Sequence, residues 1–370
     1  MDNGTEVVVI GAGIAGSAAA YYLAREGVKV QIVESEAVGC GASGYAVGLL
    51  NPLVGTGVPG ALAPLAETAF RMHIDLWPVL EDEAGVDFQA RMMPHLQLCF
   101  TEYEVRDQKL EMVRWADADG FRAEWLEPEQ VHMLEPRVSE EVLGAVLLQD
   151  VGVLDSYRLT LAFLRAAEAH GAELVHGEAT ALDTLGGRVT GVSIGRRAIE
   201  CDAVVIALGP WSGRVAEWLD VTIPVEPLKG QIIHLEGPAE PFRYHMAGPG
   251  QVAYKADGYV WLASTEEEAG FDVSLTRDAR DTLMDRGLRM VPSLGDLKLV
   301  RQTACLRPVT PDRLPVLGGA PGWEGLYLAT GAEKKGILLG PAMGRAVADL
   351  ITGGSTDLPV GPFSPERFAG

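Results

Sequence analysis

Three glycines near the start of the chain have the spacing of a turn that binds a dinucleotide. Gly11, Gly13 and Gly16 form the pattern G-x-G-x-x-G directly after the β-branched run Val7–Ile10. In such a motif the first glycine allows the tight turn, the second lets the backbone approach a pyrophosphate, and the third lets a helix pack on a strand. Glu34 follows at close to the ~20-residue spacing of an acid that accepts hydrogen bonds from ribose hydroxyls. Its charge would repel a 2′-phosphate, so the pattern disfavours NADP.

These residues require a strand, a helix and a second strand to bring them together. Residues 7–10 predict the first strand, and the Ala- and Leu-rich segment 17–26 predicts a helix that ends before Gly27. Residues 28–33 predict the second strand, which ends at Glu34. A lone G-x-G-x-x-G can also be an ordinary glycine-rich turn, but here all the parts are in register. We therefore predict a dinucleotide site with a helix N-terminus at the phosphates, and the motif leaves the identity of the dinucleotide open.

A second glycine run follows the second strand and carries a resemblance to a known family. Gly39-Cys-Gly41-Ala-Ser43-Gly44 is followed by Gly48 and by Asn51-Pro52. This stretch resembles the G-A-S-x-x-x-x-G-x-x-x-P pattern of the FAD-dependent amino-acid oxidase superfamily, which includes glycine oxidase, sarcosine oxidase and D-amino-acid dehydrogenase. Later segments that fit the same resemblance lie at 152–181, 201–212, 224–231, 306–318 and 325–344. The resemblance therefore spans nearly the whole chain.

The resemblance implies an α/β fold made of two interleaved domains. One is a Rossmann-type FAD-binding domain of the glutathione-reductase-like kind, expected at residues 1–85, 145–215 and 305–370. The other is a mostly antiparallel β substrate-binding domain that also carries helices. It is expected at residues 86–144 and 216–304, with strands at 231–235 and 259–264.

FAD is the cofactor that the resemblance implies, and a set of residues is assigned to it. FAD would contact the two glycine runs, the backbone near the adenine, the end of a buried strand and the entry to the last helix. The residues expected to bind FAD are Gly11, Gly13, Ile14, Ala15, Gly16, Glu34, Ser35, Gly41, Ala42, Ser43, Gly48, Leu49, Thr180, Ala181, Ala207, Leu208, Gly209, Trp211, Gly331, Lys335, Gly336, Ile337 and Leu338.

An arginine in the segment Leu306-Arg307-Pro308 is the candidate on which the substrate class depends. A planar guanidinium can bind a carboxylate through two parallel hydrogen bonds and so fix the direction of the neighbouring Cα–H bond. In the family the arginine of this segment binds the substrate carboxylate. The alternative is a surface ion pair, in a chain with 51 acidic residues. We predict that Arg307 is the carboxylate anchor.

Two other candidate catalytic residues, Gln251 and Lys334, depart from the glycine oxidases. Those enzymes have an aromatic residue and an arginine at the positions that align with them. Gln251 would remove a wall of the pocket, so the substrate is expected to be larger or more polar than glycine. Lys334 could bind a carboxylate as a point charge, or it could be a solvated surface lysine.

Glycines also mark the entry to the last helix. They lie between Gly331 and Gly344, and Pro341 suits the first helical turn. In the family the N-terminus of this helix faces the flavin pyrimidine, so its dipole would stabilise the negative charge that develops on reduction. The alternative is a terminal helix that merely packs, and the density of glycines argues against it.

Cys305 aligns with the cysteine that links the flavin covalently in monomeric sarcosine oxidase. The basic residues that accompany that cysteine are missing here, and a free cysteine is usually a small buried hydrophobe. We therefore expect FAD to be bound non-covalently, with Cys305 as the candidate for attachment. The seven histidines have no metal-ligand spacing, so no metal site is predicted.

The composition limits the partners and the compartment. Thirty basic and 51 acidic residues give a net charge of −21, and such a field repels phosphate backbones, which disfavours a nucleic-acid partner. The apolar stretch 7–24 contains three glycines and follows no basic residue, so neither a secretory signal nor a membrane span is expected. Four cysteines without close spacing suit a reducing interior. We expect a soluble, cytoplasmic protein.

The resemblance favours the FAD-dependent oxidation of a small amino acid or N-substituted glycine (a secondary amine) to an imine. Hydride would pass to flavin N5, the imine would hydrolyse to a 2-oxo acid and an amine, and O2 or another electron acceptor would take the electrons. Two alternatives stay open. The segments 41–44 and 310–315 also resemble the oxidase domain that acts on the carboxymethylamino group of the tRNA wobble uridine, and the chain could be a non-catalytic FAD subunit of an amine dehydrogenase complex. The sequence leaves open the amine, the choice between oxidase and dehydrogenase, and whether the protein is a homo-oligomer.

Overall fold

A sheet of short apolar strands forms the centre of one half of the molecule. The computed structural model describes residues 7–117 and 120–369; the first six residues, which bear on the expected lack of a signal sequence, lie outside this range. Five strands pair in parallel, and β19 runs antiparallel to β20. Because β1 and β13 are buried at every position, they have the continuous apolar sequences of strands covered on both faces. In spatial order the strands are β19 (Val316–Gly319), β20 (Leu326–Thr330), β13 (Ala203–Ile206), β1 (Val7–Ile10), β2 (Val30–Glu34) and β9 (Glu173–His176).

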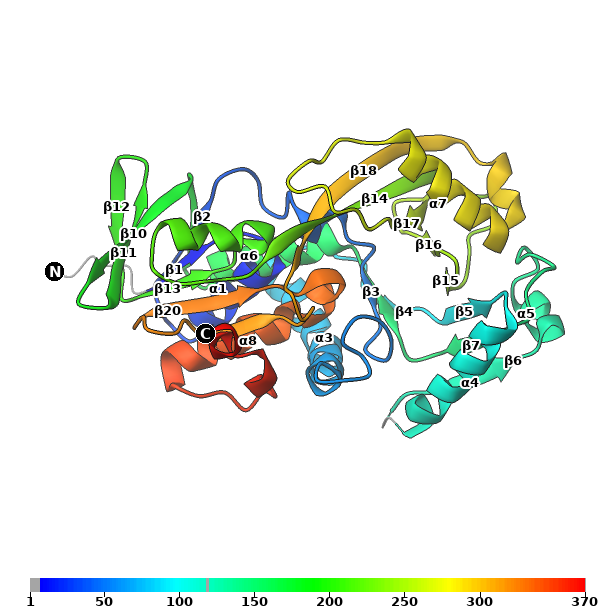
Figure 1. Ribbon diagram of the computed structural model, residues 1–370, viewed down its shortest axis with the longest axis horizontal. Coiled ribbons are helices and arrows are strands. Elements are labelled where there is room, and N and C mark those ends of the chain that lie inside the picture. Colours follow the sequence, from blue (N-terminus) through cyan, green and yellow to red (C-terminus); the bar gives the residue numbers. More distant parts are fainter. Residues whose placement is uncertain (1–6, 118–119, 370) are drawn as a thin grey trace.

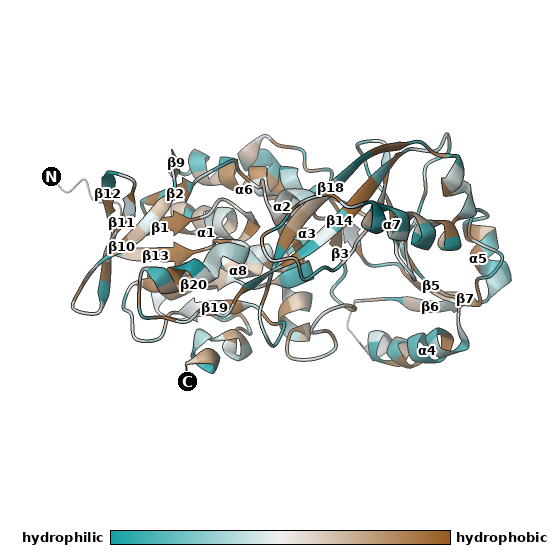
Figure 2. Cartoon of the chain, turned by 45° about the horizontal axis from the view of Figure 1, so that its top comes forward, coloured by the Kyte–Doolittle hydropathy of each residue, from teal (hydrophilic) through white to brown (hydrophobic). Residues whose placement is uncertain are grey.

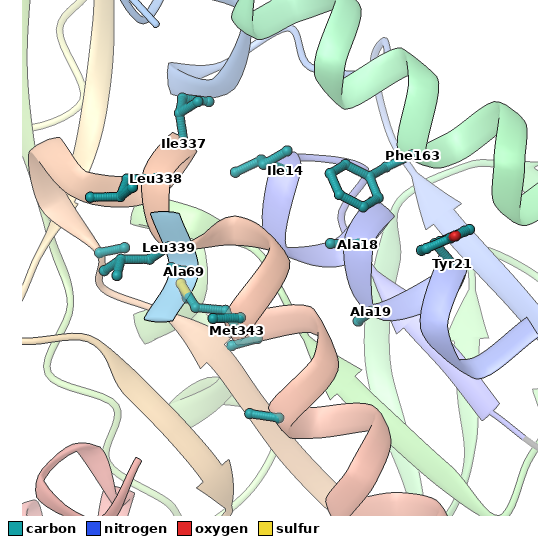
Figure 3. Close-up of a cluster of buried hydrophobic side chains, with 14 of the residues drawn as sticks. Ile14, Ala18, Ala19, Tyr21, Ala69, Phe163, Ile337, Leu338, Leu339 and Met343 are labelled. Carbon is teal, nitrogen blue, oxygen red and sulfur yellow. The ribbon is translucent and has the colours of Figure 1, made fainter. Parts of the chain in front are cut away.

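Two of the helices that pack beside this sheet cross at very short distance. A Cβ atom at Gly340 would lie 2.4 Å from Cγ1 of Ile14, and one at Gly344 would lie 2.5 Å from the backbone of Ala18. The two glycines are one helical turn apart, so together they let the backbone of α8 approach α1. Figure 3 shows the apolar side chains that fill this crossing. The helices of this half are α1 (Ile14–Arg25), α3 (Ala63–Ala84), α6 (Ser156–Ala169) and α8 (Gly336–Gly353).

An eight-stranded sheet forms the other half of the molecule. Its neighbouring strands are antiparallel, apart from the parallel pair β15 and β5. The eleven-residue strands β14 and β18 extend from the middle of the molecule toward its far end (Figure 1). In spatial order the strands are β18 (Leu299–Val309), β14 (Glu226–Glu236), β17 (Tyr259–Ala263), β16 (Gln251–Tyr254), β15 (His245–Ala247), β5 (His95–Cys99), β7 (Gly144–Leu148) and β6 (Ala123–Leu126).

Polar helices flank the second sheet. They are α4 (Glu102–Asp117), α5 (Pro128–Leu134) and α7 (Arg277–Met290), and Figure 2 shows that α4 and α7 consist largely of hydrophilic residues. The strand predicted at 231–235 lies within β14, and the one predicted at 259–264 corresponds to β17, which ends one residue earlier, at Ala263. Among the described residues, no helix combines the length and the apolar character needed to cross a membrane.

Several smaller elements complete the fold. The antiparallel strands β10 (Ala179–Leu185), β11 (Arg188–Ile194) and β12 (Arg197–Glu200) form one three-stranded sheet, and β3 (Leu49–Leu50), β8 (Gly152–Val153) and β4 (Arg91–Met92) form another. The short helices are α2 (Ala42–Tyr45) and the 3₁₀ helices η1 (Gly209–Glu217), η2 (Pro292–Asp296), η3 (Glu333–Lys335), η4 (Gly361–Phe363) and η5 (Pro365–Phe368). The chain passes between the halves several times. The predicted domain limits stay predictions. The limit predicted between residues 144 and 145 falls inside β7.

Pro341 does not lie where the sequence predicts. We expected it in the first turn of the last helix, but α8 begins at Gly336 and Pro341 lies in its second turn. A proline has no N–H, so the carbonyl of Ile337, four residues earlier, loses its helical partner. The ring nitrogen Nε2 of His73 in α3 donates to this carbonyl at 3.0 Å. Burial lowers the pKa of His73 to about 4, so the imidazole is neutral at pH 7.

Candidate active site

One cavity connects the glycine turn after β1 with the face of the eight-stranded sheet that carries Arg307. Its volume is about 680 Å³, which is within the ~300–1,000 Å³ range of ligand sites. It is lined by both glycine runs, the end of β13, part of β18 and the entry to α8. Among the described residues, no group of three or more His, Cys, Asp or Glu side chains could hold a metal ion.

The glycine turn makes the close backbone contacts that its motif predicts. Gly11 has a φ of +105°, and a Cβ atom there would lie 2.5 Å from the carbonyl oxygen of Ala207. A Cβ atom at Gly16 would lie 1.9 Å from the carbonyl oxygen of Gly11. Gly13 is the N-cap of α1 and lines the cavity. Larger residues at these positions would therefore push β1, α1 and β13 apart.

Glu34 and Ser43 organise the backbone around this turn. One carboxylate oxygen of Glu34 accepts a hydrogen bond from the N–H of Ala12 at 2.9 Å, and the other accepts from the N–H of Glu36 at 2.9 Å. The hydroxyl of Ser43 accepts from the N–H of Ile14, the first residue of α1, at 3.0 Å. The acid is thus fixed at the end of β2 beside the cavity, and the second glycine run is joined to the N-terminus of α1.

Arg307 enters the cavity from β18. It is buried, at 8% exposure, and its guanidinium donates through Nη1 to the carbonyl of Thr265 at 3.2 Å and through Nη2 to the hydroxyl of Ser264 at 2.8 Å. A Cβ atom at Gly230, on the adjacent strand β14, would lie 2.1 Å from Nη2. The guanidinium therefore occupies the space that the missing side chain of Gly230 leaves. Gln251, in β16, lines the same cavity.

Cys305 lies two residues before Arg307 and on the same face of β18, because side chains alternate along a strand. It is buried and lines the cavity. Burial raises the pKa of its thiol, and the positive charge of Arg307 offsets this rise in part. The side chain is therefore a thiol rather than a thiolate at neutral pH.

Two lysines line the cavity at the short helix η3, and they have different environments. Lys334 forms an ion pair with Glu266, so it is not a free solvated lysine. Lys335 is buried, and its ammonium donates to the carbonyl of Asn51 at 2.7 Å and to that of Val54. Burial lowers the pKa of Lys335 to about 8. Lys335 therefore ties the loop after β3 to the start of α8.

Two helix N-termini face the cavity. Gly336 and Ile337 at the start of α8 line it, as do Gly13 and Ile14 at the start of α1. The first N–H groups of a helix have no intrahelical partner and carry the positive end of the dipole. This pair of helix ends suits a ligand with negative charge at two places.

Four predicted residues do not line the cavity. Gly16 packs on the turn, and Leu338 belongs to the buried core around α8. Thr180 and Ala181 lie in β10, whereas the preceding residues 177–179 line the cavity. The other residues named from the sequence for FAD, and all three catalytic candidates, do line it.

Several polar residues of the cavity were not predicted, among them Asn51, Ser264 and Glu333. Asn51 was noted only as part of a motif, and Ser264 has no local sequence signal because its partner Arg307 is distant along the chain. Glu333 lies beside the predicted Lys334 and has a φ of +44°. Its place in the glycine-rich entry to the last helix was its only signal.

Comparison with known proteins gives the family. The DAO family, described as FAD-dependent oxidoreductases, matches residues 6–350. The chain belongs to this family. It is 31% identical to glycine oxidase of Pseudomonas aeruginosa over 363 residues, which cover 97% of this chain and 98% of that protein. The structure of glycine oxidase from Geobacillus kaustophilus matches with a TM-score of 0.93 and 27% identity over 98% of both chains. Iminodiacetate oxidase from Chelativorans sp. BNC1 matches with a TM-score of 0.90 and 25% identity, over 97% of this chain and 99% of that chain.

This FAD-dependent oxidoreductase therefore has the predicted family and fold. The parallel sheet with its glycine turn and the separate antiparallel sheet are confirmed by the full-length match to glycine oxidase. Its cavity also fits FAD on the geometry of its own residues. A Cβ atom at Gly13 would lie 3.2 Å from Oγ of Ser43, in the space that a pyrophosphate would approach. Glu34 and the N-terminus of α8 line the same cavity, where they could bind a ribose and a flavin ring.

Proposed function

We propose that this enzyme oxidises a small amino acid or an N-substituted glycine to an imine, which water hydrolyses to a 2-oxo acid and an amine. The observation that carries the proposal is the guanidinium of Arg307 in the same cavity as the dinucleotide turn. Both of its hydrogen-bond acceptors, on Ser264 and Thr265, are neutral oxygens. A buried cation without a directly bonded carboxylate is complementary to an anionic group of a ligand.

The chain's own residues would orient the substrate beside the cofactor. FAD, when bound, supplies the acceptor for the hydride that leaves the carbon next to nitrogen. Arg307 would hold the substrate carboxylate, which leaves that carbon in a fixed direction. The start of α8 would stabilise negative charge on the reduced cofactor. Gln251 puts a polar side chain where the glycine oxidases have an aromatic wall, which supports a substrate larger or more polar than glycine.

We propose further that FAD is held without a covalent bond. Cys305 lies in the cavity, but its thiol is protonated at neutral pH, and a thiolate is the nucleophilic form. The extensive cradle of backbone around the glycine turn supports retention by many hydrogen bonds. O2 or another electron acceptor would then take the electrons.

Anaerobic reduction of the purified holoenzyme tests the function. We expect the yellow flavin absorbance to bleach when an amino acid or N-alkylglycine from a panel is added without O2, and the 2-oxo acid to appear in the solution. A protein that releases FAD on denaturation but is bleached by no member of the panel would contradict the proposal. It would favour the non-catalytic subunit instead.

A further inference from the structure

A cluster of charged side chains adjoins Arg307 at the substrate end of the cavity. Glu266 pairs with Lys334 through one carboxylate oxygen, and its other oxygen lies 3.5 Å from Nη2 of Arg313. The second terminal nitrogen of Arg313 lies 3.5 Å from the carboxylate of Glu333. Arg313 therefore bridges two acids, and Glu266 bridges two bases.

The members of this cluster differ in their access to water. The side chain of Glu333 is 1% exposed, whereas those of Lys334 and Glu266 are 39% and 38% exposed. A pair exposed to this degree is weak, so a ligand could separate it. Lys334 lines the cavity, but Glu266 does not. Glu266 therefore influences a bound ligand by holding Lys334.

The charges of the cluster match a ligand with a single carboxylate. Arg307, Lys334 and Arg313 contribute three positive charges, and Glu266 and Glu333 contribute two negative ones. Burial by itself would raise the pKa of Glu266, but the hydrogen bond and charge of Lys334, together with the charges of Arg307 and Arg313, lower it below its usual value. Glu266 is thus ionised at neutral pH, and the formal charges of these five side chains sum to +1.

We propose that Glu266 is a positioning residue that sets the substrate class: by binding Lys334 it leaves the guanidinium of Arg307 for the substrate carboxylate and so favours monocarboxylic over dicarboxylic amines. The inference rests on the proposed function of Arg307. A second carboxylate on the substrate could bind Lys334 only by displacing Glu266. It would then also be repelled by the released Glu266 carboxylate.

Glu266→Gln tests the proposal with a pair of substrates that differ in one terminal group. N-Ethylglycine and iminodiacetate differ by a terminal methyl against a carboxylate. The glutamine frees Lys334, so kcat/KM for iminodiacetate should rise about 10-fold through KM, from the attraction between the freed ammonium and the second carboxylate at a few ångströms. For N-ethylglycine, which has no second carboxylate, kcat/KM should change by less than about 3-fold, an effect within the free energy of one exposed ion pair. Glu268→Gln, which removes an exposed acid two residues along the same loop, is the matched control and should leave the ratio of the two substrates unchanged.

A second variant shows whether Glu266 acts through Lys334. In Glu266→Gln/Lys334→Met the gain for iminodiacetate should disappear, because the freed cation is gone. A gain that persists in the double variant, or a ratio that does not change in Glu266→Gln, would overturn the proposal.

Binding without turnover separates this inference from the proposed function. Propionate and malonate can be titrated against the flavin absorbance of the holoenzyme, since they too differ by a methyl against a carboxylate. We expect Glu266→Gln to tighten malonate about 10-fold relative to propionate. If the wild type oxidises no amine but Glu266→Gln still tightens malonate relative to propionate, the proposed function fails, while the role of Glu266 in withholding Lys334 from a second carboxylate stands. If amines are oxidised and neither ratio moves, the inference alone fails.

Discussion

At the scale of single residues, the missing side chain of Gly230 makes room for the guanidinium of Arg307. Gly230→Ala would place a methyl group 2.1 Å from Nη2, so the guanidinium must move away from Ser264. We expect kcat/KM for the amino acid to fall about 10- to 100-fold, as for an anchor displaced by about 1 Å, with FAD content unchanged. Steady-state kinetics and the flavin absorbance of the purified variant measure both quantities.

Gly319→Ala is the control for a methyl group on a strand. The nearest atom to a Cβ there is 4.0 Å away, so this variant should keep wild-type kinetics. If Gly230→Ala also keeps wild-type kinetics, the position of Arg307 does not depend on the absence of a side chain at Gly230.

Cys305 gives the second prediction at this scale. Because its thiol is protonated at neutral pH, acid precipitation should leave FAD in the supernatant, and Cys305→Ala should keep its FAD and its activity. The measurement is the flavin absorbance of the supernatant and of the pellet. Colour that stays with the denatured chain of the wild type and is lost from the pellet of Cys305→Ala would show a covalent bond.

The residues of the cavity divide into those that a local pattern reveals and those that it does not. Gly11, Gly13 and Glu34 were predictable because their tasks follow from spacing within one βαβ unit. Ser264 and Gly230 were not, because each acquires its role only when β18 pairs with β14 and a distant loop reaches Arg307. No short window of sequence contains both members of either contact.

At the scale of elements, the crossing of α1 and α8 determines where two helix N-termini meet the cavity. Gly344→Ala would place a methyl group 2.5 Å from the backbone of α1, where no flexible side chain can yield. We expect the free energy of unfolding to fall by about 1–3 kcal/mol, the usual cost of overpacking, and FAD to be retained less well. Urea unfolding and the flavin content after purification measure these effects.

Gly353→Ala is the matched control on the same helix. Nothing lies within 4 Å of a Cβ atom at Gly353, so alanine should leave stability unchanged or raise it by about 0.5–1 kcal/mol through helix propensity. Equal losses in the two variants would mean that the crossing is not the cause.

The contact between α3 and α8 predicts a dependence of stability on pH. The folded protein keeps His73 neutral down to a pKa of about 4, whereas the unfolded chain takes up a proton near the ordinary value of 6.5. The unfolded state therefore binds more protons between these values, and stability falls as the pH is lowered from 6.5 toward 4. In His73→Gln, which keeps an N–H donor for the Ile337 carbonyl, this fall should be shallower by up to about 1.4 kcal/mol per pH unit. Unfolding curves at several pH values test this, and identical slopes would contradict it.

Pro341 shows why the limits of an element were harder to predict than its existence. A proline at the start of a glycine-rich helix suits the first turn by its local chemistry. Here a histidine from α3 replaces the lost hydrogen bond, and this allows the helix to begin five residues earlier. The local preference was overridden by a tertiary contact that the sequence pattern does not contain.

At the scale of the whole molecule, the site lies where two sheets of different kinds meet. The FAD half was predictable in detail because it depends on contiguous motifs, and its parallel sheet matches that of known glycine oxidases. The substrate half was predictable as a mostly antiparallel sheet, but the charges of Glu266, Arg313 and Glu333 come together only through the fold. The whole chain has a net charge of −21, whereas this cluster is positive. A small anionic substrate can reach such a local positive site, while the overall negative charge repels a polyanion.

The most direct test compares an amino acid with the amine that lacks its carboxylate, in the wild type and in Arg307→Ala. The account predicts that anaerobic flavin reduction in the wild type strongly prefers the amino acid, and that the variant loses this preference. It also predicts a fall in kcat/KM for the amino acid of ~30- to 5,000-fold, equivalent to the 2–5 kcal/mol of a desolvated charge pair, with FAD still bound. Equal reduction of the wild type by both compounds, or full discrimination by Arg307→Ala, would contradict the assignment of Arg307 as the carboxylate anchor.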